Sequence, residues 1–435
     1  MKKRVSRRSF LKTGALGLSV AVFPMIVPSG VFGKNSPSNR ITMGFIGVGR
    51  MGRGDLRELL GFDEVQVVAV CDADSRRMHD AKAMVDGHYG DKSCAVYGDY
   101  RELLARKDID AVAVVTPDHW HGLIAMDAVV AGKDIFLQKP MTRTIKEGRV
   151  LTDLVKRYGA VLQVGSQQRS EDNFRFACEL VRNEKIGKLH TVRVGLPIDP
   201  AGKIEKPQAV PKNLNYDLWV GPAIYKPYME KRVHPQSNYS RPGWMRVTDF
   251  TAGMITNWGA HHLDIARWGM GRTPELSGPI EIEGTAQYPR DGVWDVPGKF
   301  HIEYQYANGV KMYVTDQGEN RQGIKFEGTD GWVFVKRNYI QTYPESLMNT
   351  VFSPTDIRLY KNNNHKANFL NCIKTRSEPI APVENGHYSN ITCLIGEIAM
   401  RTGAKLRWDF KKERFIDSDE ASRMVTRSYR QPWTI

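Results

Sequence analysis

The segment ITNWGAHHLD, residues 255–264, contains side chains of the types that transfer protons or bind metals. If the segment is helical, Asn257, His261 and Asp264 share one face, because positions three and four apart are neighbours on a helix. His262 then points about 100° away from His261. Imidazole titrates near neutral pH, so we predict His261 as an acid/base group and Asn257 as its neighbour in the reaction, with a structural core role as the alternative. Asp264 either orients His261 or anchors the helix.

A metal site is not predicted. Adjacent histidines on a helix diverge and make poor joint ligands, and no third ligand stands at a conventional spacing from them. The five cysteines are an odd number and form no C-x-x-C pair, so they indicate neither a zinc site nor a disulfide framework.

A second chemical signature is GVGRMG, which follows the apolar run ITMGFIG. Gly47 is expected to allow a tight turn, Gly49 to let a pyrophosphate approach the backbone, and Gly52 to let helix and strand pack closely. Asp72 lies 20 residues beyond Gly52, at the end of the next apolar run. A carboxylate there accepts hydrogen bonds from ribose hydroxyls. The unit therefore predicts a dinucleotide site.

The carboxylate of Asp72 favours NAD over NADP, because it would repel a 2′-phosphate. Arg76 and Arg77 keep NADP open, although a solvated helix face is the simpler interpretation of both. Arg50 and Met51, within the glycine turn, are assigned to the same cofactor site.

These groups need elements that bring them together. Up to about residue 165, short apolar runs that end in Gly, Asp or Pro alternate with helical segments, which predicts an α/β Rossmann domain with a doubly wound parallel sheet over 40–165. After about residue 190, period-two alternation with Gly, Asn and Asp turns predicts an α+β domain over 166–435 with a mostly antiparallel sheet. The stretch 199–249 is expected to form loops over a cleft, and 368–403 to be helical.

The first residues resemble an export signal. SRRSFLK contains paired arginines followed by Phe and Leu, and an apolar run of 14 residues from Gly14 to Val27 comes next. This run is shorter than the ~20 residues that span a bilayer. We predict a twin-arginine signal peptide over 1–33, recognised by the twin-arginine export machinery and removed, and a periplasmic protein without a stable membrane anchor. Because this route exports folded proteins, a tightly held cofactor can be loaded before export.

Charge excludes one class of partner. The formal charge is +14, of which six positive charges lie within 1–33, and the remaining excess of about +8 is spread along the chain. No dense Lys/Arg run with interleaved aromatic residues is present, so nucleic acid is not an expected partner.

The motifs GFIGVGRMG, TPDHWH, LQKP and NWGAHHLD resemble, in order and spacing, the Gfo/Idh/MocA oxidoreductase family. The resemblance covers essentially the whole mature chain. It implies an N-terminal NAD(P)-binding Rossmann domain and a second α+β domain with a large open-faced, mostly antiparallel β-sheet. It also implies a small-molecule carbohydrate or polyol substrate and a homo-oligomer.

The resemblance also assigns residues. The family's E-K-P motif, whose lysine lies between nicotinamide and substrate, falls on Gln138, Lys139 and Pro140, and its D-x-x-x-H pair falls on Asn257 and His261. Lys139 is thus expected to assist His261 by stabilising developing alkoxide charge. The family's Glu and Asp are amides here, which removes two negative charges that would raise the proton affinity of neighbouring bases.

Further contacts are expected on both sides of the cofactor. Thr116, Pro117 and His121 would approach the nicotinamide, together with Gln138. The predicted substrate contacts are Gln168, Arg169, Trp244, Arg246, Asn257, His261 and Asp264. Aromatic residues such as Tyr216, Trp219 and Tyr228 either stack on a sugar or pack in a core.

Three functions stay open. The first is a NAD-dependent dehydrogenase of a sugar or glycoside hydroxyl that uses tightly bound NAD, with the C3 hydroxyl as one candidate. The second is a NAD-dependent glycosidase that resembles the α-N-acetylgalactosaminidases of this superfamily and works by transient C3 oxidation and elimination. The third is a non-catalytic protein that binds a cofactor or a sugar.

Overall fold

The computed structural model describes residues 40–271 and 278–435, and a single compact unit spans Ile41–Ile435. The predicted signal peptide therefore lies outside the described residues.

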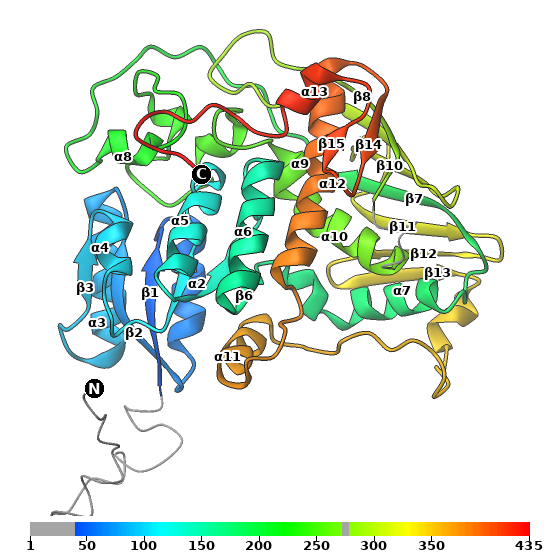
Figure 1. Cartoon of the computed structure of the whole chain (residues 1–435), viewed down its shortest axis with the longest axis horizontal. Helices are drawn as coiled ribbons and strands as arrows, with labels where there is room; N and C mark the ends of the chain where they lie inside the picture. Colours follow the sequence, from blue (N-terminus) through cyan, green and yellow to red (C-terminus); the bar gives the residue numbers. More distant parts are fainter. Residues whose placement is uncertain (1–39, 272–277) are drawn as a thin grey trace, which may run out of the picture. The chain divides into compact units, whose positions relative to one another are not determined.

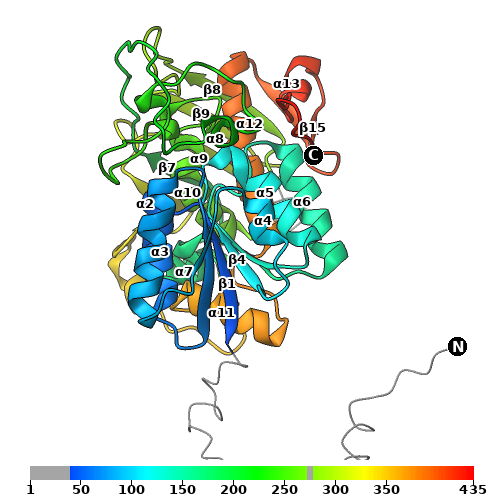
Figure 2. The same cartoon turned by 90° about the vertical axis from the view of Figure 1, so that its left-hand side faces the viewer.

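The first sheet is parallel throughout, with the strand order β3-β2-β1-β4-β5-β6 (Figure 1). Its strands are β1 (Ile41–Ile46), β2 (Val65–Cys71), β3 (Ala95–Tyr97), β4 (Ala111–Val114), β5 (Asp134–Leu137) and β6 (Leu162–Val164). Its helices are α2 (Arg50–Leu60), α3 (Ser75–Tyr89), α4 (Tyr100–Leu104), α5 (Asp118–Val130) and α6 (Ile145–Tyr158). Figure 2 shows α2 and α3 on one face and α5 and α6 on the other. This is the predicted doubly wound Rossmann arrangement.

The second sheet has nine strands in the order β13-β12-β11-β7-β10-β9-β8-β14-β15. They are β7 (Leu189–Leu196), β8 (Glu281–Ala286), β9 (Phe300–Gln305), β10 (Lys311–Asp316), β11 (Gly323–Gly328), β12 (Trp332–Lys336), β13 (Tyr339–Tyr343), β14 (Leu406–Asp409) and β15 (Arg414–Phe415). Only β7 and β10 pair in parallel, so the prediction of a mostly antiparallel sheet is confirmed.

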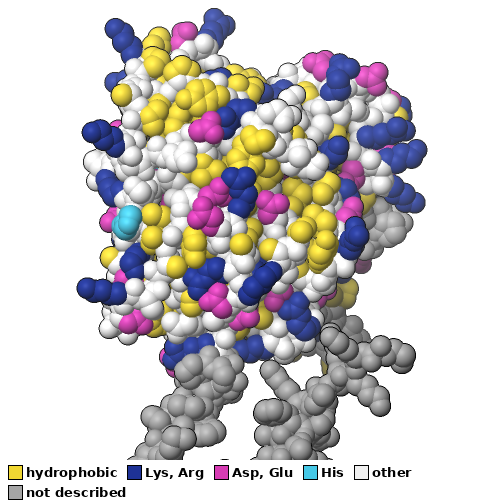
Figure 3. Space-filling model, turned by 60° about the vertical axis from the view of Figure 1, so that its left-hand side comes forward, with side chains coloured by type: hydrophobic (Ala, Val, Ile, Leu, Met, Phe, Trp, Pro, Cys, Tyr) yellow, Lys and Arg dark blue, Asp and Glu magenta, His cyan; other side chains and the backbone are white. Residues whose placement is uncertain are grey.

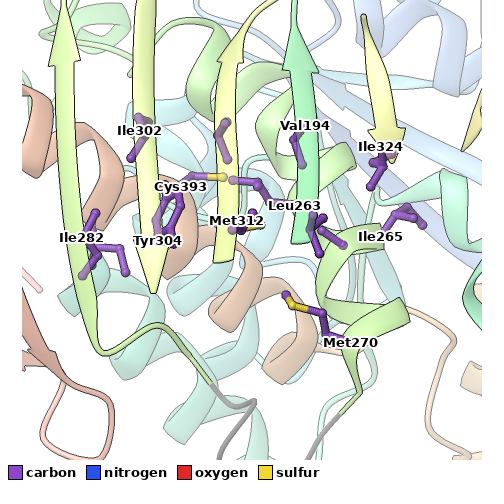
Figure 4. Close-up of a cluster of buried hydrophobic side chains, with 14 of the residues drawn as sticks. Val194, Leu263, Ile265, Met270, Ile282, Ile302, Tyr304, Met312, Ile324 and Cys393 are labelled. Atoms are coloured by element: carbon purple, nitrogen blue, oxygen red, sulfur yellow. The ribbon is translucent and has the colours of Figure 1, made fainter. Parts of the chain in front are cut away.

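One face of this sheet is covered by α7 (Asp172–Arg182), α10 (Gly259–Met270) and α12 (Val383–Thr402), whose side chains form one core with the sheet. Figure 4 shows Val194, Ile302 and Met312 from the strands facing Leu263 of α10 and Cys393 of α12. Side chains alternate between buried and more exposed along β8 and β9, as a sheet with one packed face requires.

Two predicted helices are interrupted. The helix through the histidine segment consists of α9 (Met254–Asn257) and α10, with Trp258 between them still in right-handed helical conformation. The segment 368–403, which was expected to be helical, contains two helices separated by a short break. The chain forms α11 (His365–Thr375) and α12, because Arg376 turns left-handed at φ 56° and Pro382 directly precedes α12.

The stretch 199–249 contains α8 (Tyr216–Val220), η4 (Glu230–Arg232) and η5 (Gly243–Arg246), joined by loops. The remaining short helices are η3 (Gln167–Ser170), η7 (Glu345–Asn349) and α13 (Asp419–Arg423). On the face drawn in Figure 3, Lys and Arg side chains are mixed with Asp and Glu. Within residues 40–271 and 278–435, no helix combines the length and apolarity that crossing a membrane requires.

α11 belongs to the core of the Rossmann sheet although it lies far along the chain. Phe369, Leu370 and Cys372 are fully buried in the cluster that packs α2 and α3 against the first sheet. Lys366 adds an ion pair to Asp55 of α2, with an N–O distance of 2.8 Å. The two sheets are therefore not built from two separate lengths of chain.

We expect Phe369→Ala to lower the free energy of unfolding by about 3–5 kcal/mol, because it removes a fully buried ring. The matched control is Lys374→Ala on the exposed side of the same helix, which should change stability by less than about 0.5 kcal/mol. Urea unfolding followed by tryptophan fluorescence measures both. Equal effects of the two substitutions would contradict the assignment of α11 to this core.

Candidate active site

The glycine turn between β1 and α2 has the backbone that its sequence predicts. Gly47 has φ 85°, and a Cβ atom there would lie 2.6 Å from the carbonyl oxygen of Val115. A Cβ atom at Gly52 would lie 2.1 Å from the carbonyl oxygen of Gly47, so only glycine lets α2 pack this closely. At Gly49 the nearest atom is the Arg77 guanidinium at 3.4 Å, which leaves that side of the turn open to a ligand.

Asp72 stands at the end of β2 as predicted. Its Oδ2 accepts a hydrogen bond from the backbone N–H of Val48 at 2.9 Å, and its Oδ1 accepts one from that of Asp74, also at 2.9 Å. Burial raises the pKa of Asp72, and these two N–H groups oppose the rise. The carboxylate is thus fixed beside the glycine turn with lone pairs left for further donors.

Arg77 is not on a solvated helix face, so that interpretation is wrong for this residue. It is buried, 5% exposed, and donates to the carbonyl oxygens of Pro235 at 2.9 Å and Asn238 at 3.3 Å. Its Nε lies 3.7 Å from the carboxylate of Asp74. These partners engage Nε and Nη2, whereas Nη1 faces the glycine turn at Gly49, so the alternative that Arg77 contacts a 2′-phosphate stays open.

One cavity of about 490 Å³ runs from the glycine turn to the histidine segment. Its predicted lining residues are Gly47, Gly49, Arg50, Met51, Asp72, Thr116, Pro117, His121, Gln138, Lys139, Trp244, Asn257 and His261. The volume lies in the range of small-molecule and cofactor sites. The carboxyl ends of the parallel strands and α10 of the second sheet therefore share one site.

Lys139 lies where the two sheets meet. Its Nζ donates to the backbone oxygen and to the side-chain Oδ1 of Asn257, both at 3.2 Å. Burial lowers the pKa of Lys139 to about 8, and the nearby carboxylate of Asp118 opposes this shift. A lysine with this pKa exchanges protons near neutral pH, unlike an exposed lysine.

His261 differs from its prediction. Burial, followed by the positive charges of Lys139 and Arg337, holds the pKa of its imidazole well below the usual range. The ring is therefore neutral at physiological pH, and its proton affinity is lower than a general base near neutrality requires. Its Nδ1 is buried and has no hydrogen-bond partner in the protein, although His261 lines the cavity.

His262 points away, as helical geometry predicts. It is 1% exposed, does not line the cavity, and packs against the Trp258 ring with centroids 5.3 Å apart. The side-chain amide of Gln168 lies 3.3 Å from its Nδ1. These contacts fit a structural role.

Four predicted substrate contacts and one glycine do not line the cavity: Gln168, Arg169, Arg246, Asp264 and Gly52. Asp264 forms a buried ion pair with Arg169 at 2.6 Å and accepts from the Ser389 hydroxyl at 2.8 Å. This arrangement favours the anchoring role of Asp264. Arg246 lies 3.3 Å from Asp199, with its guanidinium over the Trp294 ring at 4.4 Å.

Gln138 has a structural partner that accounts for its amide. Its Nε2 donates to Oδ2 of Asp55 at 2.9 Å, and Oδ1 of Asp55 lies 2.8 Å from Nζ of Lys366. A carboxylate at position 138 would face the Asp55 carboxylate across the same gap and be repelled.

The sequence analysis missed two charged residues of the cavity. Asp118, inside the quoted motif TPDHWH, is buried and accepts from the Thr251 hydroxyl at 2.7 Å. Arg337, in the turn between β12 and β13, reaches the cavity from the second sheet. Asp118 could have been predicted, because it follows a buried strand of the first sheet closely. The residues around Arg337 contain no pattern that indicates its place in the cavity wall.

Distant segments enclose one side of the cavity. Leu218 and Trp219 of α8 line it, and the Trp219 carbonyl oxygen accepts from Nε1 of Trp120 at 3.0 Å. The C-terminal segment runs from α13 back to the end of α5 beside which the chain terminus is marked (Figure 1). In it, Arg430 donates to the Gly221 carbonyl oxygen at 2.8 Å, and the Trp433 ring packs edge-on against Trp120 with centroids 4.7 Å apart.

The residues present fit a dinucleotide. The open glycine turn at the start of α2 suits the pyrophosphate, and Asp72 suits the ribose. Two buried polar atoms on the cavity wall, Oγ1 of Thr116 and Nδ1 of His261, have no hydrogen-bond partner in the protein and are available to a ligand or a water molecule. Within the described residues, no group of three or more His, Cys, Asp or Glu side chains is arranged to hold a metal ion.

The chain belongs to the Gfo/Idh/MocA oxidoreductase family. Residues 41–166 match the family's NAD-binding Rossmann fold, and residues 200–435 match its C-terminal alpha/beta domain. The family resemblance and the cofactor prediction, NAD, are thereby confirmed.

Two curated relatives are similar over part of the chain. The uncharacterized oxidoreductase YrbE of Bacillus subtilis is 29% identical over 157 residues, 36% of this chain and 44% of YrbE. A glycosyl hydrolase family 109 protein of Shewanella pealeana is 30% identical over 171 residues, 35% of this chain and 38% of the relative. The chain thus matches less than half the length of these proteins.

Solved structures share the fold. GenD2 from gentamicin A biosynthesis, in complex with NAD, has a TM-score of 0.61 at 17% identity and covers 85% of this chain and 97% of its own. The WlbA dehydrogenase of Bordetella pertussis, in complex with NADH and UDP-GlcNAcA, has a TM-score of 0.62 at 16% identity and covers 85% of this chain and 99% of its own.

We expect His261→Ala to lower turnover in the oxidoreductase reaction by about 10²-fold or more, since it removes a polar group from the cavity wall. His262→Ala should instead lower the free energy of unfolding by about 1–3 kcal/mol with a much smaller effect on turnover, because it removes a buried ring that packs against Trp258. Steady-state rates and urea unfolding of both variants separate the roles. Equal losses of turnover would refute the division.

Proposed function

We propose that the protein is an exported oxidoreductase that removes a hydride from a hydroxyl-bearing carbon of a sugar or glycoside and uses tightly bound NAD. One observation carries the proposal: a single cavity contains the dinucleotide-binding turn at one end and Lys139, Asn257 and His261 at the other. An exported, periplasmic location rests on the arginine pair and apolar run of residues 1–33, and a homo-oligomer rests on the family resemblance alone.

Lys139 is the better proton acceptor of the two candidates. With a pKa of about 8, a substantial fraction is neutral near physiological pH, whereas His261 is neutral but weakly basic because of its positive neighbours. Lys139 takes the hydroxyl proton, and His261 hydrogen-bonds to the same oxygen or its neighbour through Nδ1. NAD, when bound, supplies the acceptor for the hydride.

Asn257 positions Lys139 rather than acting as a base. Its Oδ1 accepts a hydrogen bond from Nζ, and an amide cannot take a proton at neutral pH. The ammonium group consequently has an uncharged partner here, which keeps its proton affinity low enough for transfer. Gly47, Gly49 and Asp72 hold the cofactor at the far end.

Tight retention of NAD is supported by the walls of the cavity. α8 is tied to α5 through Trp219 and Trp120, and Arg430 ties the C-terminal segment to the end of α8. For the dinucleotide to leave past α8, these contacts have to break. A cofactor loaded before export would remain with the protein.

A second candidate is a glycosidase that oxidises C3 transiently, eliminates the aglycone and returns the hydride. The partial similarity to glycosyl hydrolase family 109 proteins favours it, and so does an enclosed cofactor that need not exchange.

The first test mixes the purified mature protein with pyranosides and aryl glycosides after its NAD(H) content is measured by mass spectrometry of the denatured supernatant. We expect bound NAD(H), and a keto sugar with reduction of the cofactor or an added acceptor. Aglycone release without net reduction would establish the glycosidase instead. Bound dinucleotide with neither reaction would establish a non-catalytic protein, and protein that neither releases nor binds dinucleotide would refute both enzymatic functions.

The second test is the pH profile of kcat/KM. If neutral Lys139 is the base, the rate rises with pH and levels off above about 8, because deprotonation of a group with a lowered pKa generates the active form. Lys139→Met should abolish this limb and lower the rate by about 10²–10⁴-fold. His261→Ala should keep the limb at a lower rate. A limb that survives in Lys139→Met would show that another group is the base.

A further inference from the structure

We propose that the substrate is an acidic sugar, one that carries a carboxylate, sulfate or phosphate group, and that Arg337 binds this group. The inference rests on the proposed function and narrows its substrate class. It derives from the placement of one guanidinium and from the charges that face it.

Arg337 is held in the cavity wall by its surroundings. It occupies the turn between β12 and β13, where the next residue, Asn338, has φ 56°. Its guanidinium carbon lies 4.8 Å from the centroid of the Trp258 ring, and Trp258 directly follows Asn257. The favoured amide orientation of Gln168 accepts from Nε of Arg337 at 3.3 Å. These contacts fix the stem and Nε and leave the terminal nitrogens for an anion.

No carboxylate of the described residues lies within ion-pair distance of Arg337. Glu171 is the one acidic group that opposes the lowering of its pKa by burial, and it does so without forming an ion pair. A half-buried guanidinium without a paired anion is costly, so a ligand anion would be stabilised beside it.

The remaining charges at this end do not supply the missing anion. Asp118 faces Lys139 and His121 and accepts from Thr251, so its charge is directed to the lysine. Arg241 is a further positive group near Lys139, and it pairs with Asp199 at 3.2 Å. Arg246 shares the Asp199 carboxylate at 3.3 Å, so neither Asp118 nor Asp199 is left to pair with Arg337.

Two uncharged side chains also line this cavity. Gln138 and Asn257 are amides, so neither would repel an acidic substrate. The cofactor does not account for Arg337 either. Its pyrophosphate is expected at the glycine turn and the start of α2, whereas Arg337 comes from the second sheet beside Asn257 and His261.

The test is calorimetric binding to the NAD-loaded protein of matched probes: methyl glucuronide against methyl glucoside, methyl galacturonide against methyl galactoside, and glucose 6-sulfate and glucose 6-phosphate against glucose. We expect at least one acidic probe to bind about tenfold or more tightly than its neutral match. Arg337→Gln should abolish the preference, and Arg337→Lys should retain part of it. The arm that shows the preference identifies the acidic group.

The control is Arg321→Gln, which removes a guanidinium that also stacks on an aromatic ring, Phe334 at 4.4 Å, but lies outside the cavity lining. It should keep the preference, and unfolding midpoints should show that all variants fold. Equal binding of acidic and neutral probes, absence of binding by every acidic probe, or a preference that survives Arg337→Gln would each overturn the inference. If the protein oxidises neutral sugars and shows no preference for acidic ones, the proposed function holds and the inference about Arg337 fails. If acidic probes bind through Arg337 but no sugar is oxidised and no aglycone is released, the anion site holds and the proposed function fails.

Discussion

The contact between Lys139 and Asn257 joins the two sheets at the reacting centre, and the rest of the site depends on its chemistry. The ammonium group is buried against two uncharged oxygens at 3.2 Å, so it loses hydration without gaining a direct ion pair. Its pKa falls to about 8, with Asp118 limiting the fall. The same positive charge helps to keep His261 neutral. Lys139 and His261, which line the same cavity, therefore differ in proton affinity. Such a difference lets one group accept a proton while the other stays neutral and forms hydrogen bonds.

The two amides at positions 138 and 257 have different causes. The amide of Gln138 is explained by a structural contact. Its Nε2 donates to Asp55, and Asp55 forms an ion pair with Lys366 of α11 in the Rossmann core. Asn257 instead contacts Nζ of Lys139, the group that we propose as the proton acceptor. Restoring a carboxylate at 138 would place like charges together in the core, whereas restoring one at 257 would raise the pKa of Lys139 and move it away from neutrality.

The sequence predicted what is local. The strand, glycine turn, helix and Asp72 lie within one short unit whose backbone geometry follows from its residue types, and Lys139 and His261 fall on motifs at element ends. Contacts between distant segments left no such pattern. Arg169 and Asp264 were expected at the substrate, but they neutralise each other in the core, and Arg77 is buried by a loop that starts far beyond it. α8 and Arg337 line the cavity only because segments far along the chain fold back on the first sheet, and the C-terminal segment contacts the end of α8 through Arg430.

Enclosure of the cofactor constrains the reaction as well as its binding. If α8 and the C-terminal segment hold NAD in place, a hydride taken from one substrate has to leave through the substrate end of the same cavity. In a redox-neutral glycosidase the hydride then returns to the same molecule. In an oxidoreductase it passes to a second molecule, which enters after the first product leaves. In both cases Lys139, His261 and Arg337 contact the ligand during each of the two hydride transfers, one in each direction. Lys139, with a pKa of about 8, suits both directions, because a group near its pKa donates a proton as readily as it accepts one.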